Sequence, residues 1–230
     1  EKATARAGLA DAVAAVGDGP EVWVRVNPPS TEWFADDAAA VPPGVAAVVV
    51  PKLDRAEAVR EVAAALGDRP VVAGLETVLG VLDARTVLVP PVVACYFGAE
   101  DYVADLGGAR TAENHEVAHA RALVAMAARV AGVAALDMVT IDFHDGERFL
   151  AEAREARSLG YAGKICIHPS QVPLAHEAFR PTPEEVAWAR GLLAAYDAAG
   201  SRTIAYEGQM VDEVVAVRAR AVLAAAADDG

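Results

Sequence analysis

Short apolar runs alternate with longer alanine-rich stretches along most of this sequence, and that alternation limits the possible folds more than any other feature. The runs lie at residues 22–26, 46–50, 71–75, 92–97, 136–141 and 164–167. Each is apolar at consecutive positions and most are rich in β-branched residues, which is typical of strands covered on both faces. Strands separated by helical stretches predict a parallel sheet built from βα units.

A polar residue stands at or just beyond the end of every predicted strand. These residues are Asn27, Lys52, Glu76, Asp101, Asp142 and His168, spaced 24 to 26 residues apart except for one step of 41 across a helix expected at 113–129. A doubly wound sheet gathers ligand groups mainly at one switch point, whereas polar groups at nearly every strand end favour a (β/α)₈ TIM barrel. Because six units are visible and a closed barrel has eight strands, we expect the first two strands to lie upstream of Glu1.

Near residue 180 the βα pattern gives way to helices. Thr182-Pro183-Glu184-Glu185 combines an N-cap, a proline at the first helical position and a capping glutamate. A second helix is expected after Asp212, and the polar segment 201–210 between the two helices could extend toward another molecule. We therefore expect a barrel over residues 1–180 and a helical extension over 181–230 that exchanges contacts with a neighbouring subunit.

The chain is strongly acidic. Its 230 residues carry a formal net charge of −13, with a pI near 4.8. Binding to nucleic acid needs clustered Lys and Arg side chains, which this sequence lacks, so nucleic acid is not an expected partner. The sequence has neither a run of 18 or more apolar residues nor a signal pattern, which predicts a cytoplasmic protein with no membrane partner. An anionic substrate would have to be held by a metal ion or by a few local cations.

Two carboxylates suggest where such a metal ion would bind. Glu76 and Asp101 follow consecutive predicted strands, and neighbouring strands lie about 4.8 Å apart, so both carboxylates can share one ion. Oxygen ligands with room for water and a substrate oxygen suit Mg²⁺. The alternative is that both residues cap the helices that follow them, as acidic residues often do at βα junctions.

Cations and a histidine at other strand ends are candidates for substrate binding. Arg25 lies within a strand, where burying its charge is costly unless it meets an anion, and a structural ion pair is the alternative. Lys52 could meet a phosphate or carboxylate, but on its own it fits a solvated surface role better. His168 and Pro169 end the last strand, where barrels commonly hold phosphate, yet a histidine before proline is more often a turn residue than a base.

Taken in order, these motifs resemble the citrate lyase β-subunit-like branch of the HpcH/HpaI aldolase family. The resemblance covers nearly the whole chain, and it is the ordered set rather than any single motif that is specific. The motifs are Val24-Arg25-Val26-Asn27, Val50-Pro51-Lys52, Leu75-Glu76-Thr77, Phe97-Gly98-Ala99-Glu100-Asp101, Lys164-Ile165-Cys166-Ile167-His168-Pro169-Ser170-Gln171 and Glu207-Gly208-Gln209-Met210-Val211-Asp212. One departure is that the acidic Asp-Leu-Glu-Asp stretch, which in the family precedes the element matched by residues 2–6, is absent.

The resemblance implies a role for each candidate residue. It implies Mg²⁺ on Glu76 and Asp101, with Arg25 against the acyl or carboxylate oxygens of the substrate. It further implies a homotrimer, or a dimer of trimers, in which Asp212 reaches the site of a neighbouring subunit and transfers a proton. The remaining residues would bind substrate carboxylate or coenzyme A; they are the turn Gly98, Ala99 and Glu100 together with Lys52, His168 and Pro169.

The implied activity is that of a Mg²⁺-dependent carbon–carbon lyase. Such an enzyme would cleave a short 3-hydroxyacyl-CoA ester by a retro-Claisen or aldol route through a thioester enolate, whose charge is the main barrier. Malyl-, citramalyl-, citryl- and hydroxymethylglutaryl-CoA are all open as substrates. Two alternatives are a class II pyruvate-type aldolase of the same superfamily and a non-catalytic subunit that binds CoA.

Overall fold

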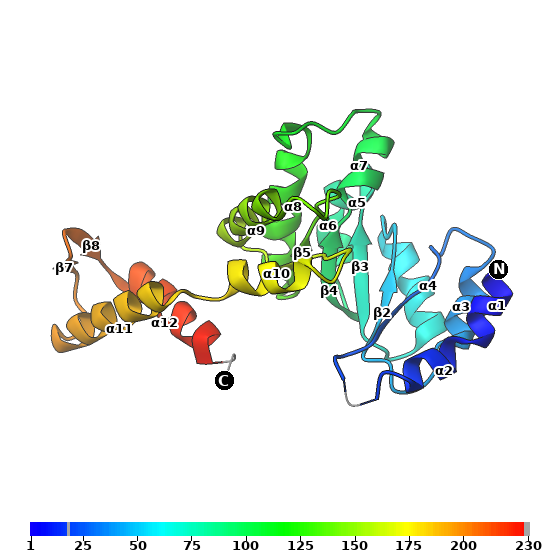
Figure 1. Cartoon of the computed structure of the whole chain (residues 1–230), viewed down its shortest axis with the longest axis horizontal. Helices are drawn as coiled ribbons and strands as arrows, with labels where there is room; N and C mark the ends of the chain where they lie inside the picture. The colour runs from blue at the N-terminus through cyan, green and yellow to red at the C-terminus, as the bar shows by residue number, and fades with distance from the viewer. Residues whose placement is uncertain (18, 228–230) are drawn as a thin grey trace. The chain divides into compact units, whose positions relative to one another are not determined.

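The computed structural model describes residues 1–17 and 19–227, which form two compact units, Glu1–Ala175 and His176–Gly230 (Figure 1). Each unit has its own packed elements and is described by itself below. None of the helices in the described residues is both long and apolar enough to cross a membrane.

The first unit is built on one parallel sheet of six strands. The strands are β1 (Trp23–Arg25), β2 (Ala47–Val50), β3 (Val71–Leu75), β4 (Val92–Phe97), β5 (Ala134–Asp137) and β6 (Gly163–Lys164). They lie side by side in chain order, and every neighbouring pair is parallel. This confirms the predicted parallel sheet of βα units, whereas the two further strands of a closed barrel stay a prediction.

Helices precede the first strand of this unit, connect successive strands and follow the last one. They are α1 (Lys2–Ala7), α2 (Leu9–Ala14), α3 (Phe34–Ala40), α4 (Ala56–Leu66), α5 (Val78–Leu82), α6 (Ala84–Val87), α7 (Ala99–Leu106), α8 (His115–Ala131) and α9 (Gly146–Leu159), with α10 (Gln171–Phe179) running across the division between the units. In α4, the buried residues Ala58, Val59, Val62 and Leu66 share one face at helical spacing. Helix α8 packs against β4 and β5, and α9 packs against β6.

The sheet curls so that its inner face surrounds a cavity. In register, Arg25 lies beside Val49 and Val49 beside Val72, and these residues point to the same face. Residues from all six strands line a single cavity of about 530 Å³, which a flat sheet could not do. The unit therefore has the curled, half-barrel form that a TIM-barrel-like α/β fold requires.

Strands β5 and β6 end earlier than predicted. Beyond each strand, side-chain hydrogen bonds hold the backbone in place of strand pairing. The predicted strands 136–141 and 164–167 end at Asp137 and Lys164. Asp142 lies in a turn, where its carboxylate accepts a hydrogen bond from His144 N. Beyond β6, Gln171 Oε1 accepts a hydrogen bond from Ile167 N at 2.8 Å, in the role a neighbouring strand would have. The predicted boundaries were wrong here because hydrogen bonds made by single side chains leave no periodic signal in the sequence.

The second unit contains two helices and a hairpin. Its elements are α11 (Pro183–Ala198), β7 (Ile204–Tyr206), β8 (Gln209–Val211) and α12 (Glu213–Ala227). The capping box at Thr182 and Glu185 is present as predicted. A small core forms where Leu192 and Tyr196 of α11 pack with Val211 and Ala216.

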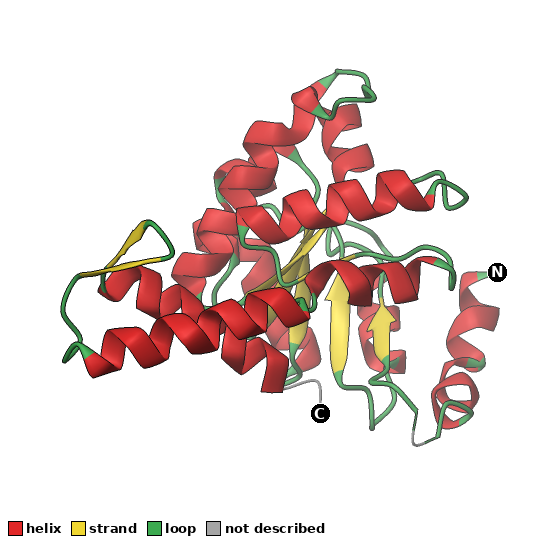
Figure 2. Cartoon of the chain, turned by 60° about the vertical axis from the view of Figure 1, so that its left-hand side comes forward, coloured by secondary structure: helices red, strands yellow, loops and turns green. Residues whose placement is uncertain are grey.

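The polar segment 201–210 between the two helices forms a hairpin. Strands β7 and β8 are antiparallel and form the short yellow ribbon of Figure 2. Glu207 and Gly208 between them both have positive φ angles, 48° and 77°, as a tight two-residue hairpin turn requires. The segment is therefore a paired hairpin, and its contact with a neighbouring subunit stays a prediction.

Candidate active site

The cavity on the inner face of the sheet gathers most of the predicted site residues. Its lining includes Arg25, Glu76, Gly98, Ala99, Glu100 and Asp101. Trp23, Tyr96 and Lys164 also line it, although the sequence analysis did not single them out. The polar groups come from the carboxyl ends of the strands and the loops beyond them, where barrel enzymes carry their catalytic residues.

Glu76 follows β3 and is almost completely buried, with 3% of its surface exposed. Its carboxyl group lies against Gly98, where any side chain would collide with it. Glycine at position 98 is therefore what lets the neighbouring loop approach this carboxylate. Among the described residues, Glu76 Oε1 has no hydrogen-bond partner, and a buried oxygen without a partner is costly unless a ligand or water meets it.

Neighbouring groups shift the pKa of Glu76 in opposite directions. Burial raises the pKa of Glu76 above its usual range, and the negative charge of Asp101 raises it further. Tyr96, Arg25 and Lys52 oppose that rise. The effect of Asp101 on Glu76 shows that the two carboxyl groups are close enough to interact, and a cation bound between them would favour the ionised form of Glu76.

Asp101 does not end a strand, as the sequence analysis expected, but lies in the first turn of α7. The strand β4 stops at Phe97, and the chain turns into the helix at Gly98. Asp101 Oδ1 lies 2.9 Å from Lys52 Nζ, and this hydrogen bond raises the pKa of the Lys52 ammonium group. Lys52 therefore meets a carboxylate, and that carboxylate belongs to the protein itself.

The carboxylate pair fits a hard divalent cation. Glu76 offers a buried oxygen without a protein partner, and Asp101 already binds a cationic group at the same rim. Within the described part of the chain, no group of three or more His, Cys, Asp or Glu side chains could hold a metal ion. Two carboxylates that leave the other positions to water and substrate are typical of Mg²⁺ sites.

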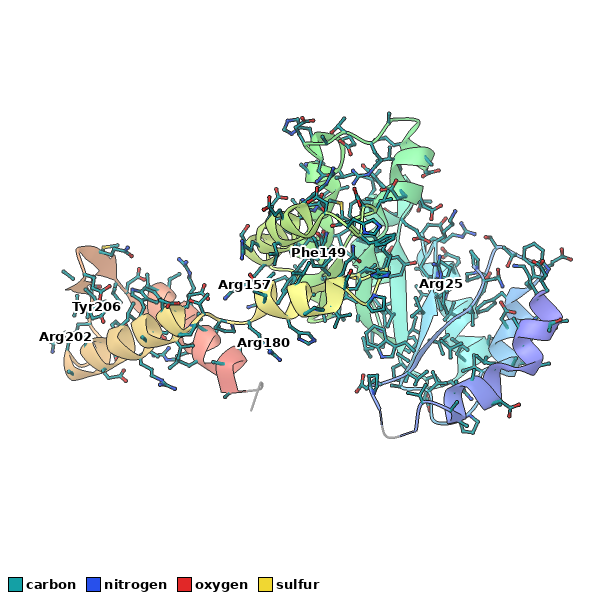
Figure 3. The ribbon with its side chains drawn as sticks, viewed as in Figure 1. Arg25, Phe149, Arg157, Arg180, Arg202 and Tyr206 are labelled. Atoms are coloured by element: carbon teal, nitrogen blue, oxygen red, sulfur yellow. The ribbon has the colours of Figure 1, made fainter. Side chains whose placement is uncertain are left out.

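Arg25 extends from β1 on the side that lines the cavity (Figure 3). Neither a hydrogen bond nor an ion pair to any described residue holds its guanidinium group, so the structural ion pair weighed as the alternative is not found there. Its positive charge lowers the pKa of Glu76 from across the cavity. Arg25 is thus a cation available to an anionic ligand.

The turn into α7 offers fewer backbone donors than predicted. Gly98 N donates a hydrogen bond to Leu75 O at 3.1 Å, so this amide is already used. Ala99 and Glu100 begin the helix, where backbone N–H groups have no acceptor within the helix. The Glu100 carboxylate is held by Arg110 at 2.8 Å.

His168 has the geometry of a turn residue. Its Nδ1 lies 2.8 Å from Ser170 Oγ and accepts a hydrogen bond from Ser170 N at 3.2 Å. Its ring stacks on Phe143, with 4.5 Å between centroids. Among the described residues that line the cavity, Ile167 is present but His168 and Pro169 are not.

Asp212 belongs to the second unit. Its Oδ1 accepts a hydrogen bond from Val215 N at 3.2 Å, at the start of α12. This is the geometry of a helix cap. A role in catalysis therefore stays a prediction, taken up below.

Lys164, which lines the cavity, belongs to a buried cluster of charged side chains. Lys164 Nζ donates to Asp137 Oδ2 at 3.2 Å and to Met138 O at 2.7 Å, and it lies 3.4 Å from Glu152 Oε2. Arg121 binds both oxygens of Asp137, at 3.0 and 3.1 Å. Because both cations and both anions are paired, the cluster fixes the ends of β5 and β6 without leaving an unpaired charge.

Glu152 should stabilise the fold through this cluster. Burial opposes its ionisation, but the hydrogen bond from Thr140, the charge of Lys164 and the hydrogen bond from Arg148 together lower the pKa of Glu152 to about 2. A lowered pKa stabilises the folded state above the ordinary value of 4.5, and the effect disappears as the pH falls toward 2. Glu152→Gln should therefore reduce the free energy of unfolding at pH 7 by about 3 kcal/mol.

Denaturant titrations of both proteins between pH 7 and pH 2.5 would measure this difference. The gap should narrow as the pH falls below 4.5. Glu147→Gln, on the exposed surface of the same helix, is the matched control and should change stability by no more than about 0.5 kcal/mol. A pH-independent loss in Glu152→Gln would show that packing, not charge, explains the effect.

Comparisons with known proteins agree with this architecture. Residues 1–169 match the profile of the HpcH/HpaI aldolase/citrate lyase family. The citrate lyase subunit beta-like protein of Deinococcus radiodurans is 50% identical over 210 residues, covering 88% of this chain and 74% of that protein. The mitochondrial citramalyl-CoA lyase of Rattus norvegicus is 33% identical over 151 residues, covering 60% of this chain and 45% of that protein.

A solved structure extends the similarity to the fold. It is that of CitE from Mycobacterium tuberculosis in complex with magnesium, acetoacetate and coenzyme A, with a TM-score of 0.80, 37% sequence identity and coverage of 94% of this chain and 83% of that one. A sequence match over most of the chain, together with the same fold, is decisive for membership. The chain belongs to the HpcH/HpaI aldolase/citrate lyase family.

Proposed function

We propose that this chain is a Mg²⁺-dependent carbon–carbon lyase that cleaves a short 3-hydroxyacyl-CoA ester. The observation that carries the proposal is the buried, unpartnered oxygen of Glu76, in one cavity with Asp101 and the unpaired Arg25. Relatives named as lyases, and a similar structure that holds magnesium and coenzyme A, support this choice of chemistry.

Glu76 and Asp101 would hold the metal ion, and Arg25 would meet the substrate. When bound, Mg²⁺ supplies positive charge that polarises the hydroxyl or keto oxygen and an adjacent carboxylate. Breaking the bond between the α-carbon and the carbinol carbon leaves a thioester enolate. The guanidinium group of Arg25 would stabilise its developing oxyanion, since it is fixed on a strand and has no competing protein partner.

Lys52 would change partners when the site is loaded. It is paired with Asp101, and a metal ion on that carboxylate would compete for the same oxygen. Released from Asp101, the ammonium group would lie at the rim, free to meet a phosphate or carboxylate of the CoA ester. The amides of Ala99 and Glu100 would receive the substrate carboxylate, while Gly98 shapes the turn and His168 and Pro169 border the CoA moiety.

Asp212 would complete the site from a neighbouring subunit. A carboxylate at a subunit seam is partly desolvated, which raises its pKa and suits it to proton transfer. Asp212 directly follows β8, so the hairpin would carry it to the adjoining barrel in a homotrimer or a dimer of trimers. The barrel over 1–180, the exchanging extension over 181–230 and the cytoplasmic location belong to the same proposal.

A screen of four thioesters tests the proposed activity. Malyl-, citramalyl-, citryl- and hydroxymethylglutaryl-CoA would be incubated with and without Mg²⁺, and both products would be identified. A lyase should release acetyl-CoA together with glyoxylate, pyruvate, oxaloacetate or acetoacetate, respectively, and only with the metal. Free CoA without an oxo acid would indicate a thioesterase. If no thioester were turned over, cleavage of a 4-hydroxy-2-keto acid in a separate assay would indicate a pyruvate-type aldolase, and no turnover there either would indicate a binding subunit.

A further inference from the structure

Tyr96 lies inside the half barrel, directly beneath the carboxylate of Glu76. It stands on β4 opposite Gly74 of β3 in the strand register. The ring reaches across to β3, since a Cβ atom placed on Gly74 would collide with Tyr96 Oη and lie 2.7 Å from Tyr96 Cζ. The missing side chain at position 74 is therefore what makes room for the phenol group.

Apolar neighbours explain why the Tyr96 ring is buried, but no contact with a described residue explains why its hydroxyl group is buried. Tyr96 is 8% exposed and packs in a cluster with Val72 and Ala94. Its hydroxyl has no hydrogen-bond partner among the described residues, although buried tyrosine hydroxyls usually find one. Tyr161, on the other side of the sheet, is an example, because its Oη donates to Arg121 O at 2.9 Å.

The two unpartnered buried side-chain oxygens in the described part of the chain are Tyr96 Oη and Glu76 Oε1. Gly74 is the register partner of Tyr96, and Glu76 lies two residues beyond it, on the same face and diagonal to Tyr96. Burial raises the pKa of the Tyr96 hydroxyl and the Glu76 charge raises it further, as expected for a phenol close to a carboxylate. A donor and an acceptor are thus adjacent and buried, and neither has a hydrogen-bond partner at normal bonding geometry among the described residues.

We propose that Tyr96 is a positioning residue for the metal site, whose hydroxyl donates a hydrogen bond to the Glu76 carboxylate when that carboxylate binds a divalent cation. The inference rests on the proposed function, because it takes Glu76 as a metal ligand. Gly98 lies against one side of the carboxyl group, and the hydrogen bond from the phenol would close another. With both in place, the flexible glutamate side chain is held in one orientation toward the cavity, which strengthens metal binding.

Mg²⁺ affinity measured without substrate tests this role. Isothermal titration of MgCl₂ into wild type and Tyr96→Phe should show binding weakened about 10- to 100-fold in the variant, the range expected when a partner of a metal ligand is lost. The ring is retained, so circular dichroism should be unchanged. In a Glu76→Gln background, which lacks the carboxylate, Tyr96→Phe should have no further effect on Mg²⁺ binding.

Tyr161→Phe is the matched control, since it removes another buried tyrosine hydroxyl outside the cavity lining. It should lower the melting temperature and leave Mg²⁺ affinity unchanged. Equal Mg²⁺ affinity in wild type and Tyr96→Phe would overturn the positioning role while the proposed function stands. If the wild type itself bound no Mg²⁺, the proposed function would fail as well, so the two failures are distinguishable.

Discussion

Glu76→Gln is expected to abolish Mg²⁺-dependent cleavage of the CoA ester, with kcat/KM falling roughly a thousandfold or more, which corresponds to about 4 kcal/mol of transition-state stabilisation. The amide keeps the shape of the side chain but removes the charge that holds the metal ion. Asp101→Asn should have a comparable effect for the same reason. Steady-state kinetics across a range of Mg²⁺ concentrations would measure both.

Loss of activity in Glu76→Gln should not come from unfolding. Because burial raises the pKa of Glu76, the ionised form at neutral pH opposes folding of the metal-free protein. The stability linked to this group is present below its ordinary pKa and is lost as the pH rises through the raised value. The neutral glutamine should therefore leave the melting temperature equal or higher at pH 7. Glu61→Gln, on the exposed side of α4, is the control and should retain full activity.

The second large effect concerns Asp212. Asp212→Asn and Glu76→Gln oligomers should each be inactive, yet mixing them under conditions of subunit exchange should restore activity. Random exchange of equal amounts leaves about one quarter of the sites with an intact metal pair and an intact Asp212 from the neighbour. Asparagine caps helices as well as aspartate does, so the start of α12 should be preserved in the variant.

With one of the two variants labelled uniformly with ¹⁵N, native mass spectrometry would establish that mixed oligomers have formed in that experiment, since the two substitutions alone change the mass equally. Each variant incubated alone under the same conditions is the control. Mixed oligomers without recovered activity would mean that Asp212 serves only its own helix cap, and its catalytic role would then be withdrawn.

The sequence predicted those parts of the fold that depend on local pattern. Strands β3 and β4 begin and end at the predicted residues, because an apolar, β-branched run between two turns is a strong local signal. The ends of β5 and β6 could not be predicted in this way. They depend on Lys164 and Gln171, whose partners lie up to 31 residues away in the chain.

The sequence predicted which residues form the candidate site, but not which of them bind one another. Glu76 and Asp101 were identified from their places after strands, yet the pattern did not show that Asp101 lies in a helix and binds Lys52. Tyr96 was hidden within an apolar strand, and only the strand register shows that it faces the same cavity. The hairpin around Gly208 had a sequence signal, namely two short alternating segments on either side of a glycine-containing turn. The polar composition of the segment concealed that signal.

A crystal grown with Mn²⁺ in place of Mg²⁺ tests the central claim most directly, because the anomalous signal of manganese locates the ion independently of activity. The account predicts one strong peak in the cavity, bonded to carboxylate oxygens of both Glu76 and Asp101, with Lys52 displaced from Asp101. A crystal without a peak between these carboxylates, in which Lys52 keeps its 2.9 Å contact with Asp101, would contradict it.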